Sequence, residues 1–375
     1  MFPLTDKQVV WADHIWGKLD TKLQWVSEES KNKIPYTTIN GVHDDKALTS
    51  INWWTNGFWP GMMWLMYVGT KNEQYRKVAE HAELLLDQAL ANYSRLDHDV
   101  GFLWHISAGV NYRLFGGKAS YNRAMFAASI LAGRYNAAGK FIRAWNGNGT
   151  GWAIIDCMMN LPLLYWASDE TNDPRFSYIA QNNANTSMKN HVRADGSVYH
   201  ILTYDPNSGE LLGPVDGQGY APDSSWSRGQ AWALYGFVLS YIHTDKQEYL
   251  DTAKRVAHYF IASVCDDYLP KCDFRSPADP VIYDTTAGAC AACGLLEIAN
   301  CVPKHEKRTY VNAAINLLQA IETKFCDWSE QEQSIVQGGT EAYHRTDTQH
   351  IPIIYGDYFF AEAIYKLKGF TMLFW

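Results

Sequence analysis

The feature that most constrains the fold is a repeated alternation between two kinds of helical segment. One kind opens with polar or capping residues and continues with apolar residues at helical spacing, as in an amphipathic helix with one solvated face. Four copies also place an aromatic residue three or four positions before an alanine, and a looser fifth copy begins at Ser120; the four span residues 71–90, 173–192, 245–264 and 306–325. The other kind is apolar nearly all round, which predicts burial; its copies span residues 52–69, 100–117, 151–168, 224–243, 285–300 and 356–369.

This alternation predicts the architecture. Each pair of segments takes roughly 50–70 residues, and about six pairs follow one another, as in helical repeat proteins. Six pairs can close on themselves, so we expect an all-α fold, an (α/α)6 toroid or six-hairpin barrel, with outer helices shielding inner ones. Alternating β-branched runs that would predict strands are nearly absent. Because no low-complexity linker divides the chain, residues 1–375 are predicted to form a single domain.

Composition and charge exclude several classes of function. The chain is 47% hydrophobic and 19% charged, which predicts a globular protein with a large core. Its formal net charge of −8 offers no basic surface for nucleic acid or for an anionic membrane. Residues 1–20 lack a basic segment followed by an apolar run, and no later window holds roughly 18 uncharged apolar residues. We therefore expect neither a nucleic-acid nor a membrane partner.

The seven cysteines favour reduced, buried thiols. Their number is odd, and several lie in apolar segments that are predicted to be helical, which indicates a cytoplasmic protein. Cys290 and Cys293 have the spacing of a metal-binding pair, but no second pair follows at the required distance. The sequence also lacks a glycine-rich phosphate loop, an H-E-x-x-H motif and a G-x-S-x-G motif. We therefore expect no metal and no cofactor.

Aromatic residues are unusually abundant, with 15 Trp, 23 Tyr and 15 Phe. The stretch INWWTNGFWPGMMW at residues 51–64 concentrates four of the tryptophans. Stacking on the apolar faces of sugar rings is one use for such a surplus, and a large helical core is the alternative. The segments richest in Gly, Asn, Asp and His are predicted to be loops gathered at one end of the toroid, where function usually lies; they are residues 95–100, 140–151, 195–224 and 326–356.

Two acids stand in informative contexts. Asp156 falls within an apolar segment predicted to be an inner helix, where an ionised carboxylate is costly unless it is paired or functional. Asp99 lies at a predicted junction of loop and helix, where it could be an N-cap instead. If both face the same end of the toroid, each raises the proton affinity of the other, and one can stay protonated near neutral pH. The pair would then supply an acid without a metal.

Several other polar side chains lie among aromatic residues. They include His98 beside Asp99, His200 in SVYHIL and Gln218 in DGQGYAP. Arg228 precedes Trp232 by four residues, so both lie on one helical face and could bind a carboxylate and stack on a sugar ring. Pairing of the arginine with a core acid is the alternative.

Five runs of sequence together resemble the unsaturated glucuronyl hydrolases of glycoside hydrolase family 88. They are WTNGFWPGMMW (54–64), HDVGF (98–102), IDCMMNLPLL (155–164), DSSWSRGQAWALYGF (223–237) and IYGDYFF (354–360). Members of that family fold as (α/α)6 barrels. They release a 4,5-unsaturated uronic acid from the non-reducing end of oligosaccharides left by polysaccharide lyases. The resemblance spans almost the whole chain.

The resemblance implies roles for particular residues. Asp156 matches the general acid/base and Asp99 its partner carboxylate. Substrate-site positions are matched by Trp54, His98, Trp145, His200, Gln218, Arg228, Trp232 and Tyr355. The loop at 205–217 carries no motif of the family, so recognition of the second sugar stays open.

The implied partner is an unsaturated oligosaccharide, and we expect a monomer or a weak homo-oligomer. Three alternatives remain at this stage: an unsaturated rhamnogalacturonyl hydrolase, an inverting glycosidase on the same fold, and a non-catalytic oligosaccharide-binding protein. The presence of both Asp99 and Asp156 favours an enzyme over a binding protein.

Overall fold

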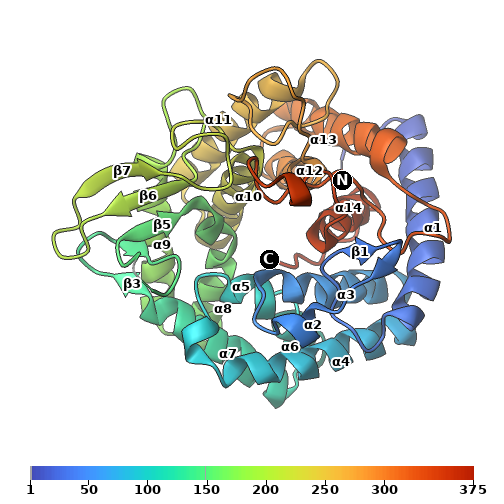
Figure 1. The fold of residues 1–375 in the computed structure, drawn as a ribbon, viewed down its shortest axis with the longest axis horizontal. Coiled ribbons are helices and arrows are strands. Elements are labelled where there is room, and N and C mark those ends of the chain that lie inside the picture. Colours follow the sequence, from blue (N-terminus) through green and yellow to red (C-terminus); the bar gives the residue numbers. More distant parts are fainter. Residues whose placement is uncertain (1, 148) are drawn as a thin grey trace.

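The computed structural model describes residues 2–147 and 149–375, and its helices form two concentric rings (Figure 1). The inner ring consists of α3 (Phe58–Thr70), α5 (Val100–Trp104) with α6 (Ala108–Phe115), α8 (Leu161–Thr171), α10 (Ser227–Thr244), α12 (Thr285–Cys301) and α14 (Ile354–Leu367). The outer ring consists of α1 (Asp6–Glu29), α4 (Glu73–Leu90), α7 (Lys118–Gly133), α9 (Pro174–Asn190), α11 (Gln247–Val264) and α13 (Lys304–Phe325). Outer and inner helices alternate along the chain, as the predicted all-α toroid requires.

The two rings differ in burial as their sequences predict. In α12, residues 285–299 are all buried, because small side chains let neighbouring helices approach from every side. Gly294 shows how close the approach is, since a Cβ there would lie 2.3 Å from Leu234 Cδ2 of α10. In α11 the buried residues recur at helical spacing along one face. Outer helices of this kind cover inner helices that have no solvated face.

The helix α1, the outer helix nearest the start of the chain, was not predicted from the sequence. Its N-terminus has a capping box, in which the Gln8 N–H donates to Thr5 Oγ1 and the Thr5 N–H donates to Gln8 Oε1. One face of α1 is buried and contains Ile15, Leu19 and Leu23. The helix lacks the aromatic and alanine spacing of the other outer helices. It packs beside both α4 and α14 and so closes the ring.

Inner helices are interrupted at the end of the ring where the candidate residues lie. Residues 52–69 contain a 3-10 helix, η1 (Trp54–Gly57), before α3, and the next predicted inner helix is divided between α5 and α6. The prediction that Asp156 lies inside an inner helix is wrong, because it lies in the 3-10 helix η3 (Ile155–Met159) that precedes α8. Pro162 occupies the first turn of α8, where a residue without an N–H is best tolerated.

Strands are present at this end, although the sequence predicts almost none. An antiparallel sheet in the order β5-β6-β7 is formed by β5 (Trp152–Ile154), β6 (Ile201–Tyr204) and β7 (Leu211–Val215). Two hairpins join β1 (Thr38–Ile39) to β2 (Val42–His43) and β3 (Tyr135–Asn136) to β4 (Phe141–Ile142). The prediction of a loop at 195–224 is therefore wrong over β6 and β7. Strands this short show too little alternation to be recognised from sequence.

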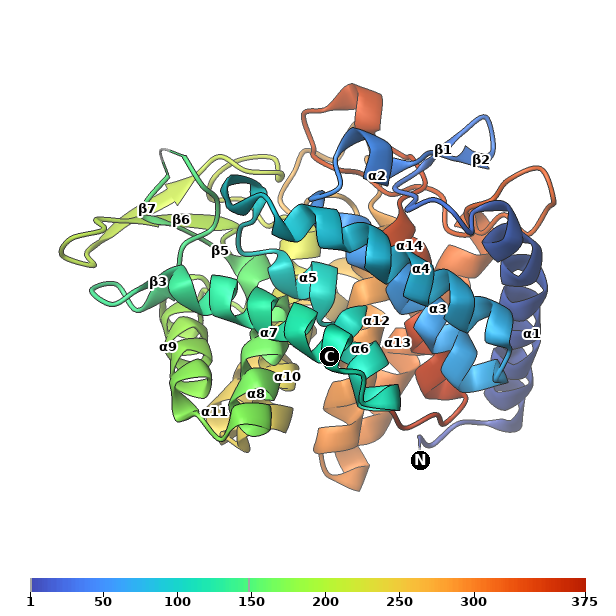
Figure 2. The ribbon, with the colours of Figure 1, turned by 90° about the horizontal axis from the view of Figure 1, so that it is seen from below.

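The strands and long loops gather at one end of the toroid, as Figure 2 shows. Three further short helices belong to these connections: α2 (Lys46–Thr49), η2 (Tyr93–Arg95) and η4 (Thr346–Thr348). We call this end the mouth. Residues that directly precede different inner helices, or lie in their first turns, are brought together there.

The centre of the ring is filled by side chains. Trp375 is buried, and its ring centroid lies 6.3 Å from that of Phe58 in α3, 5.8 Å from Phe102 in α5 and 5.9 Å from Phe359 in α14. The indole N–H of Trp375 donates to Glu362 of α14 at 3.0 Å. Because these neighbours belong to three inner helices, the end of the described chain occupies the middle of the ring (Figure 1).

Most buried apolar side chains belong to one contiguous core that extends from Ala12 in α1 to Trp375. A second small cluster lies against the sheet and consists of Phe141, Ala153, Leu202 and Tyr204. Among the helices of the described residues, none combines the length and the hydropathy needed to span a bilayer.

Candidate active site

Asp99 lies at the mouth, at the start of the short inner helix α5. It occupies the N-cap position, but its side chain makes no capping hydrogen bond, so the alternative of a structural cap is not supported. The side chain is 11% exposed. Burial, followed by the charges of Asp97 and Asp156, raises the pKa of Asp99 well above its usual range. Arg134 and a hydrogen bond from Asn160 offset part of this increase.

His98 is buried beside Asp99. Its Nδ1 lies 3.0 Å from the carbonyl oxygen of Ala144 and is therefore the donor nitrogen, while Nε2 lies 3.1 Å from Asp99 Oδ1. Burial lowers the pKa of His98, which favours a neutral ring whose Nε2 lone pair faces Asp99. A protonated Asp99 carboxyl can donate to that lone pair. The surroundings of His98 and Asp99 thus favour a protonated Asp99 carboxyl.

Asp156 lies in η3, next to the sheet that positions His200. Ile154 pairs with Ile201 between β5 and β6, which brings the residues flanking these strands side by side. His200 Nε2 lies 3.5 Å from Asp156 Oδ1, and neither atom has a hydrogen-bond partner among the described residues. The Asp156 side chain is 12% exposed. Because buried polar atoms are normally paired within the protein, this open arrangement favours a functional acid over a network acid.

The orientation of His200 depends on the segment after β7. The Gln218 N–H donates to His200 Nδ1 at 3.1 Å, which leaves the proton of a neutral ring on Nε2, facing Asp156. Gly217 permits this approach, because a Cβ there would lie 2.2 Å from His200 Nδ1. The Gln218 side chain donates to the carbonyl of Glu341 at 2.8 Å. The backbone N–H of Gln218 therefore fixes the orientation of the His200 ring, which lies beside the candidate acid Asp156.

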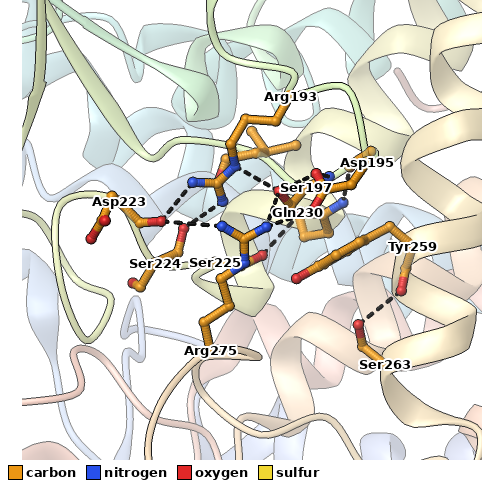
Figure 3. A network of polar contacts seen from close by, with 12 residues as sticks. Arg193, Asp195, Ser197, Asp223, Ser224, Ser225, Gln230, Tyr259, Ser263 and Arg275 are labelled. Carbon is orange, nitrogen blue, oxygen red and sulfur yellow. Dashed lines mark hydrogen bonds and ion pairs between the residues drawn. The ribbon is translucent and has the colours of Figure 1, made fainter.

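Two arginines anchor the segment that leads into α10, as Figure 3 shows. Arg193 donates to the carbonyl oxygens of Asp223 and Ser224, each at 2.6 Å. Arg275 also donates to the Asp223 carbonyl, at 3.4 Å, and pairs with Asp195 at 2.6 Å. These bonds fix the backbone entering α10 and hence the side chains of its first turn.

Arg228 lies in the first turn of α10 and is buried. It forms an ion pair with Asp284 and donates to the carbonyls of Thr340 and Glu341, each at 2.7 Å. Its guanidinium carbon lies 5.4 Å from the centre of the Tyr355 ring. Of the two roles open from the sequence, this geometry corresponds to pairing with a core acid. A contact between Arg228 and the sugar stays a prediction.

Trp54, at the start of η1, is the half-buried member of an aromatic group at the mouth. Its ring centroid lies 5.0 Å from that of Tyr355 and 6.5 Å from that of Trp232. Trp232 and Tyr355 are 0% and 1% exposed, so they support Trp54 and offer no open face to a sugar in this structure. The predicted wall at Trp232 does not match this burial. Of the other indoles in the tryptophan-rich stretch, Trp59 and Trp64 are fully buried core residues, whereas Trp53 is half-buried.

Trp145 lies near the acids, in the loop after β4. It is half-buried, and its ring centroid lies 5.7 Å from that of His98 at an interplanar angle of 82°. Trp145 also contacts Trp152 of β5, at 6.0 Å. The structure thus gathers all ten sequence-predicted residues at the mouth or directly beneath it. Four of them are enclosed by protein, namely His98, Arg228, Trp232 and Tyr355.

Asp97, His98 and Asp99 are also a possible set of metal ligands, since one atom from each lies within 4.8 Å of the others. Carboxylates suit a hard cation. However, His98 Nδ1 is engaged with the Ala144 carbonyl, and the raised pKa of Asp99 opposes the deprotonated state that a ligand requires. The prediction of a site without a metal stays a prediction.

Two residues of the site, Asn160 and Glu341, were not predicted from the sequence. Asn160 Oδ1 accepts from the Phe102 N–H at 2.9 Å. The Glu341 carboxylate accepts from the Tyr36 hydroxyl, and its carbonyl accepts from Arg228. Asn160 belongs to the run IDCMMNLPLL and directly precedes an apolar helix. A polar residue at a position expected to be buried could have been recognised from the sequence. Glu341 had no such signal, because its partners lie far away in the sequence.

Comparisons with known proteins show the family of the chain. The chain matches the model of Glycosyl Hydrolase Family 88 over residues 26–270. It is similar to the unsaturated glucuronyl hydrolase of Bacillus sp. (strain GL1), with 35% identity over 338 residues, covering 86% of this chain and 88% of that protein. It is also similar to the unsaturated chondroitin disaccharide hydrolase of Streptococcus pneumoniae (strain ATCC BAA-255 / R6), with 30% identity over 388 residues, covering 99% and 95%.

Solved structures extend the likeness to three dimensions. The unsaturated glucuronyl hydrolase from Streptococcus agalactiae matches with a TM-score of 0.89 and 29% identity, covering 99% of this chain and 94% of that one. The family model and these relatives are of glycosyl hydrolases, so the chain is a glycoside hydrolase. The chain belongs to glycoside hydrolase family 88. The fold, the family and the enzyme class predicted from the sequence are confirmed.

Proposed function

We propose that the chain releases 4,5-unsaturated glucuronic acid from the non-reducing end of lyase-generated oligosaccharides, chiefly those from glycosaminoglycans. One observation carries the assignment of the chemistry to Asp99 and Asp156. The two carboxyl groups are buried at the same mouth, and they are close enough for the charge of Asp156 to raise the pKa of Asp99. Both side chains also keep a small exposed fraction through which a substrate can be reached.

The substrate makes a single acid sufficient. Its unsaturated ring carries a C4=C5 enol ether conjugated to a carboxylate. A proton delivered to C4 and a water oxygen added at C5 form a hemiketal, which opens and expels the aglycone. One carboxyl group can give the first proton and then take one from the attacking water. Ordinary glycosidases need two carboxylates for acid and base. Asp156 performs both transfers in this proposal.

The neighbouring residues have supporting roles. Asp99, with His98 beside it, holds a proton that it passes to Asp156, and Asp156 delivers that proton to C4. Asp99 recovers a proton through Asp156 after the water is deprotonated, and it also orients the Asp156 side chain. The unpartnered Nε2 of His200 is placed to donate to a polar group of the sugar, and Trp54 supplies a stacking surface. Arg228 already has an acid partner, so His200 is the better candidate for the uronate group.

Ultraviolet absorbance of the conjugated alkene tests the proposal. We expect it to disappear when the protein is mixed with lyase-generated disaccharides, and we expect no cleavage of the saturated counterparts. Cleavage of saturated substrates would indicate an inverting glycosidase, and preference for an unsaturated rhamnogalacturonan product would indicate the related hydrolase. Calorimetric binding without turnover would indicate a sugar-binding protein. A panel with and without sulfate would identify the aglycone.

We also propose that residues 1–375 act as a single catalytic domain in the cytoplasm, as a monomer or a weak homo-oligomer. The contiguous core supports one domain. All seven cysteines are free thiols, which suits a reducing compartment. Light scattering over a range of protein concentrations would test the oligomeric state.

A further inference from the structure

Asn160 joins the two segments that carry the candidate acids. It is fully buried and lies where η3 ends and α8 begins. Its Oδ1 accepts from the N–H of Phe102, three residues after Asp99, at 2.9 Å. Its Nδ2 lies 3.4 Å from the carbonyl oxygen of Asp156. The amide is also close enough to the Asp99 carboxyl to lower the pKa of that group. A single amide thus contacts both acid-bearing segments.

The fit around Asn160 leaves little freedom. A Cβ on Gly101 would lie 2.5 Å from Asn160 Oδ1 and 2.8 Å from its Cα, so α5 and the start of α8 are in direct contact. An apolar side chain of similar size would leave the Phe102 N–H buried without a partner. An amide supplies one acceptor and two donors, whereas an ionised carboxylate supplies only acceptors. The position therefore uses the particular chemistry of asparagine.

We propose that Asn160 is a positioning residue for the acid pair, holding Asp99 and Asp156 at a working separation through its acceptor on one side and its donors on the other. The proposal rests on the assigned roles of Asp99 and Asp156. It adds a residue that touches the acids and has no exposed surface with which to touch the sugar.

The donor of Asn160 acts within a crowded electrostatic environment. The charged and titratable groups around Asp99 are Asp97, His98, Arg134, Asp156 and Cys157. Burial is the main cause of the raised pKa of Asp99, and Asn160 and Arg134 are the two influences that lower it. Removal of the Asn160 donor therefore leaves Arg134 alone to oppose burial. Asp99 then keeps its proton to higher pH.

Asn160→Asp tests the proposal, because it retains an oxygen for the Phe102 N–H and removes the donors. We expect kcat to fall on the order of 100-fold, since small displacements of catalytic groups have effects of this size, with a much smaller change in KM. The alkaline limb of the pH profile of kcat/KM should move to higher pH. Asn183→Asp is the matched control, because Asn183 is a buried amide of α9 whose oxygen accepts from the Ile142 N–H at 2.8 Å. Its profile should stay at the wild-type position.

A wild-type kcat and alkaline limb in Asn160→Asp would overturn the proposal, and so would an equal displacement in Asn183→Asp. Asn160→Ser provides a second test that needs neither a new charge nor turnover. Carbon-13 NMR of labelled aspartate carboxyls, with Asp99 assigned from Asp99→Asn, should show Asp99 titrating at higher pH in Asn160→Ser than in the wild type. An unchanged titration would overturn the proposal whether or not a disaccharide is cleaved. Failure of the wild-type protein to cleave any unsaturated disaccharide would instead contradict the proposed function.

Discussion

The acids at the mouth can be compared with a second group, Glu297 and Glu362, buried deeper in the inner ring. Glu362 accepts from the Tyr235 hydroxyl at 2.5 Å and from the Trp375 indole at 3.0 Å, and it pairs with Lys366 at 3.2 Å. Lys366 also pairs with Glu297. At the mouth, no lysine or arginine of the described chain pairs with either candidate acid, and one oxygen of the acid in η3 has no partner.

The difference separates structural acids from available ones. A buried carboxylate with a full set of donors and a cation has no capacity left on its oxygens for a ligand. A buried carboxylate without them keeps an oxygen open to a substrate, as Asp156 does. Asp284 belongs to the first kind although it lies near the mouth, because Arg228 neutralises it. Location alone therefore does not identify a catalytic acid.

The largest effect is expected from Asp156→Asn. The variant removes the group proposed to move both protons, so kcat on an unsaturated disaccharide should fall by a factor of about 10² to 10⁴. The melting temperature should change little, because the open oxygen has no protein partner. Decay of the ultraviolet absorbance measures the rate. A near-normal rate would place Asp156 among the structural acids and break the comparison.

Lys366→Met tests the other half of the comparison. It leaves two buried carboxylates without a cation, and the free energy of unfolding should fall by about 3–5 kcal/mol. Urea denaturation measures this loss, and kcat of the folded protein should be unchanged. Lys368→Met is the matched control, since Lys368 pairs with the half-exposed Asp13 and should contribute less than about 1 kcal/mol. Equal losses in the two variants would contradict the structural role.

A buried base provides a pH test outside both groups of acids. Burial, with Lys33 and Lys22, lowers the pKa of His43 from 6.5 to about 3. Between these values the unfolded chain binds the proton and the folded chain does not, so stability is present above pH 6.5 and is lost as the pH falls toward 3. One such group changes the free energy of unfolding by at most about 1.4 kcal/mol per pH unit. His43→Gln should reduce the slope, measured by urea denaturation at several pH values, and an unchanged slope would contradict the assignment.

The smallest effect is expected at the rim of the site. Trp54→Ala removes the half-buried indole proposed to stack on the sugar, which should weaken binding by about 1 kcal/mol and raise KM about fivefold. Trp54→Phe should recover part of the loss. Tyr178→Ala, at a 62% exposed aromatic residue of α9, is the control and should leave KM unchanged. An unchanged KM in Trp54→Ala would show that the sugar does not contact this ring.

Much of the fold was predictable because helical periodicity is a local property of the sequence. Inner and outer helices could be told apart by whether one face or every face was apolar. The pairing of β5 with β6 was not predictable, since these strands are far apart in the chain, and the β6-β7 hairpin was missed because its strands are short. The helix α1 was missed because it lacks the spacing shared by the other outer helices.

The site was predictable where its chemistry is carried by short runs of sequence. Asp99 and Asp156 were found from an acid in apolar surroundings and from the family resemblance. The surroundings of Arg228 were not predictable, because its acid partner lies 56 residues further along the chain. Asn160 could be read as a buried polar residue, but its contact with α5 appears only when the ring closes.

The packing of Trp375 against three inner helices has a consequence for how a polymer can be attacked. A polysaccharide cannot thread through a ring whose centre holds an indole and its aromatic neighbours. A sugar can therefore approach the two acids only from the mouth, which suits removal of one unit from a chain end. The freed sugar must then retreat by the route that the next chain end needs for entry.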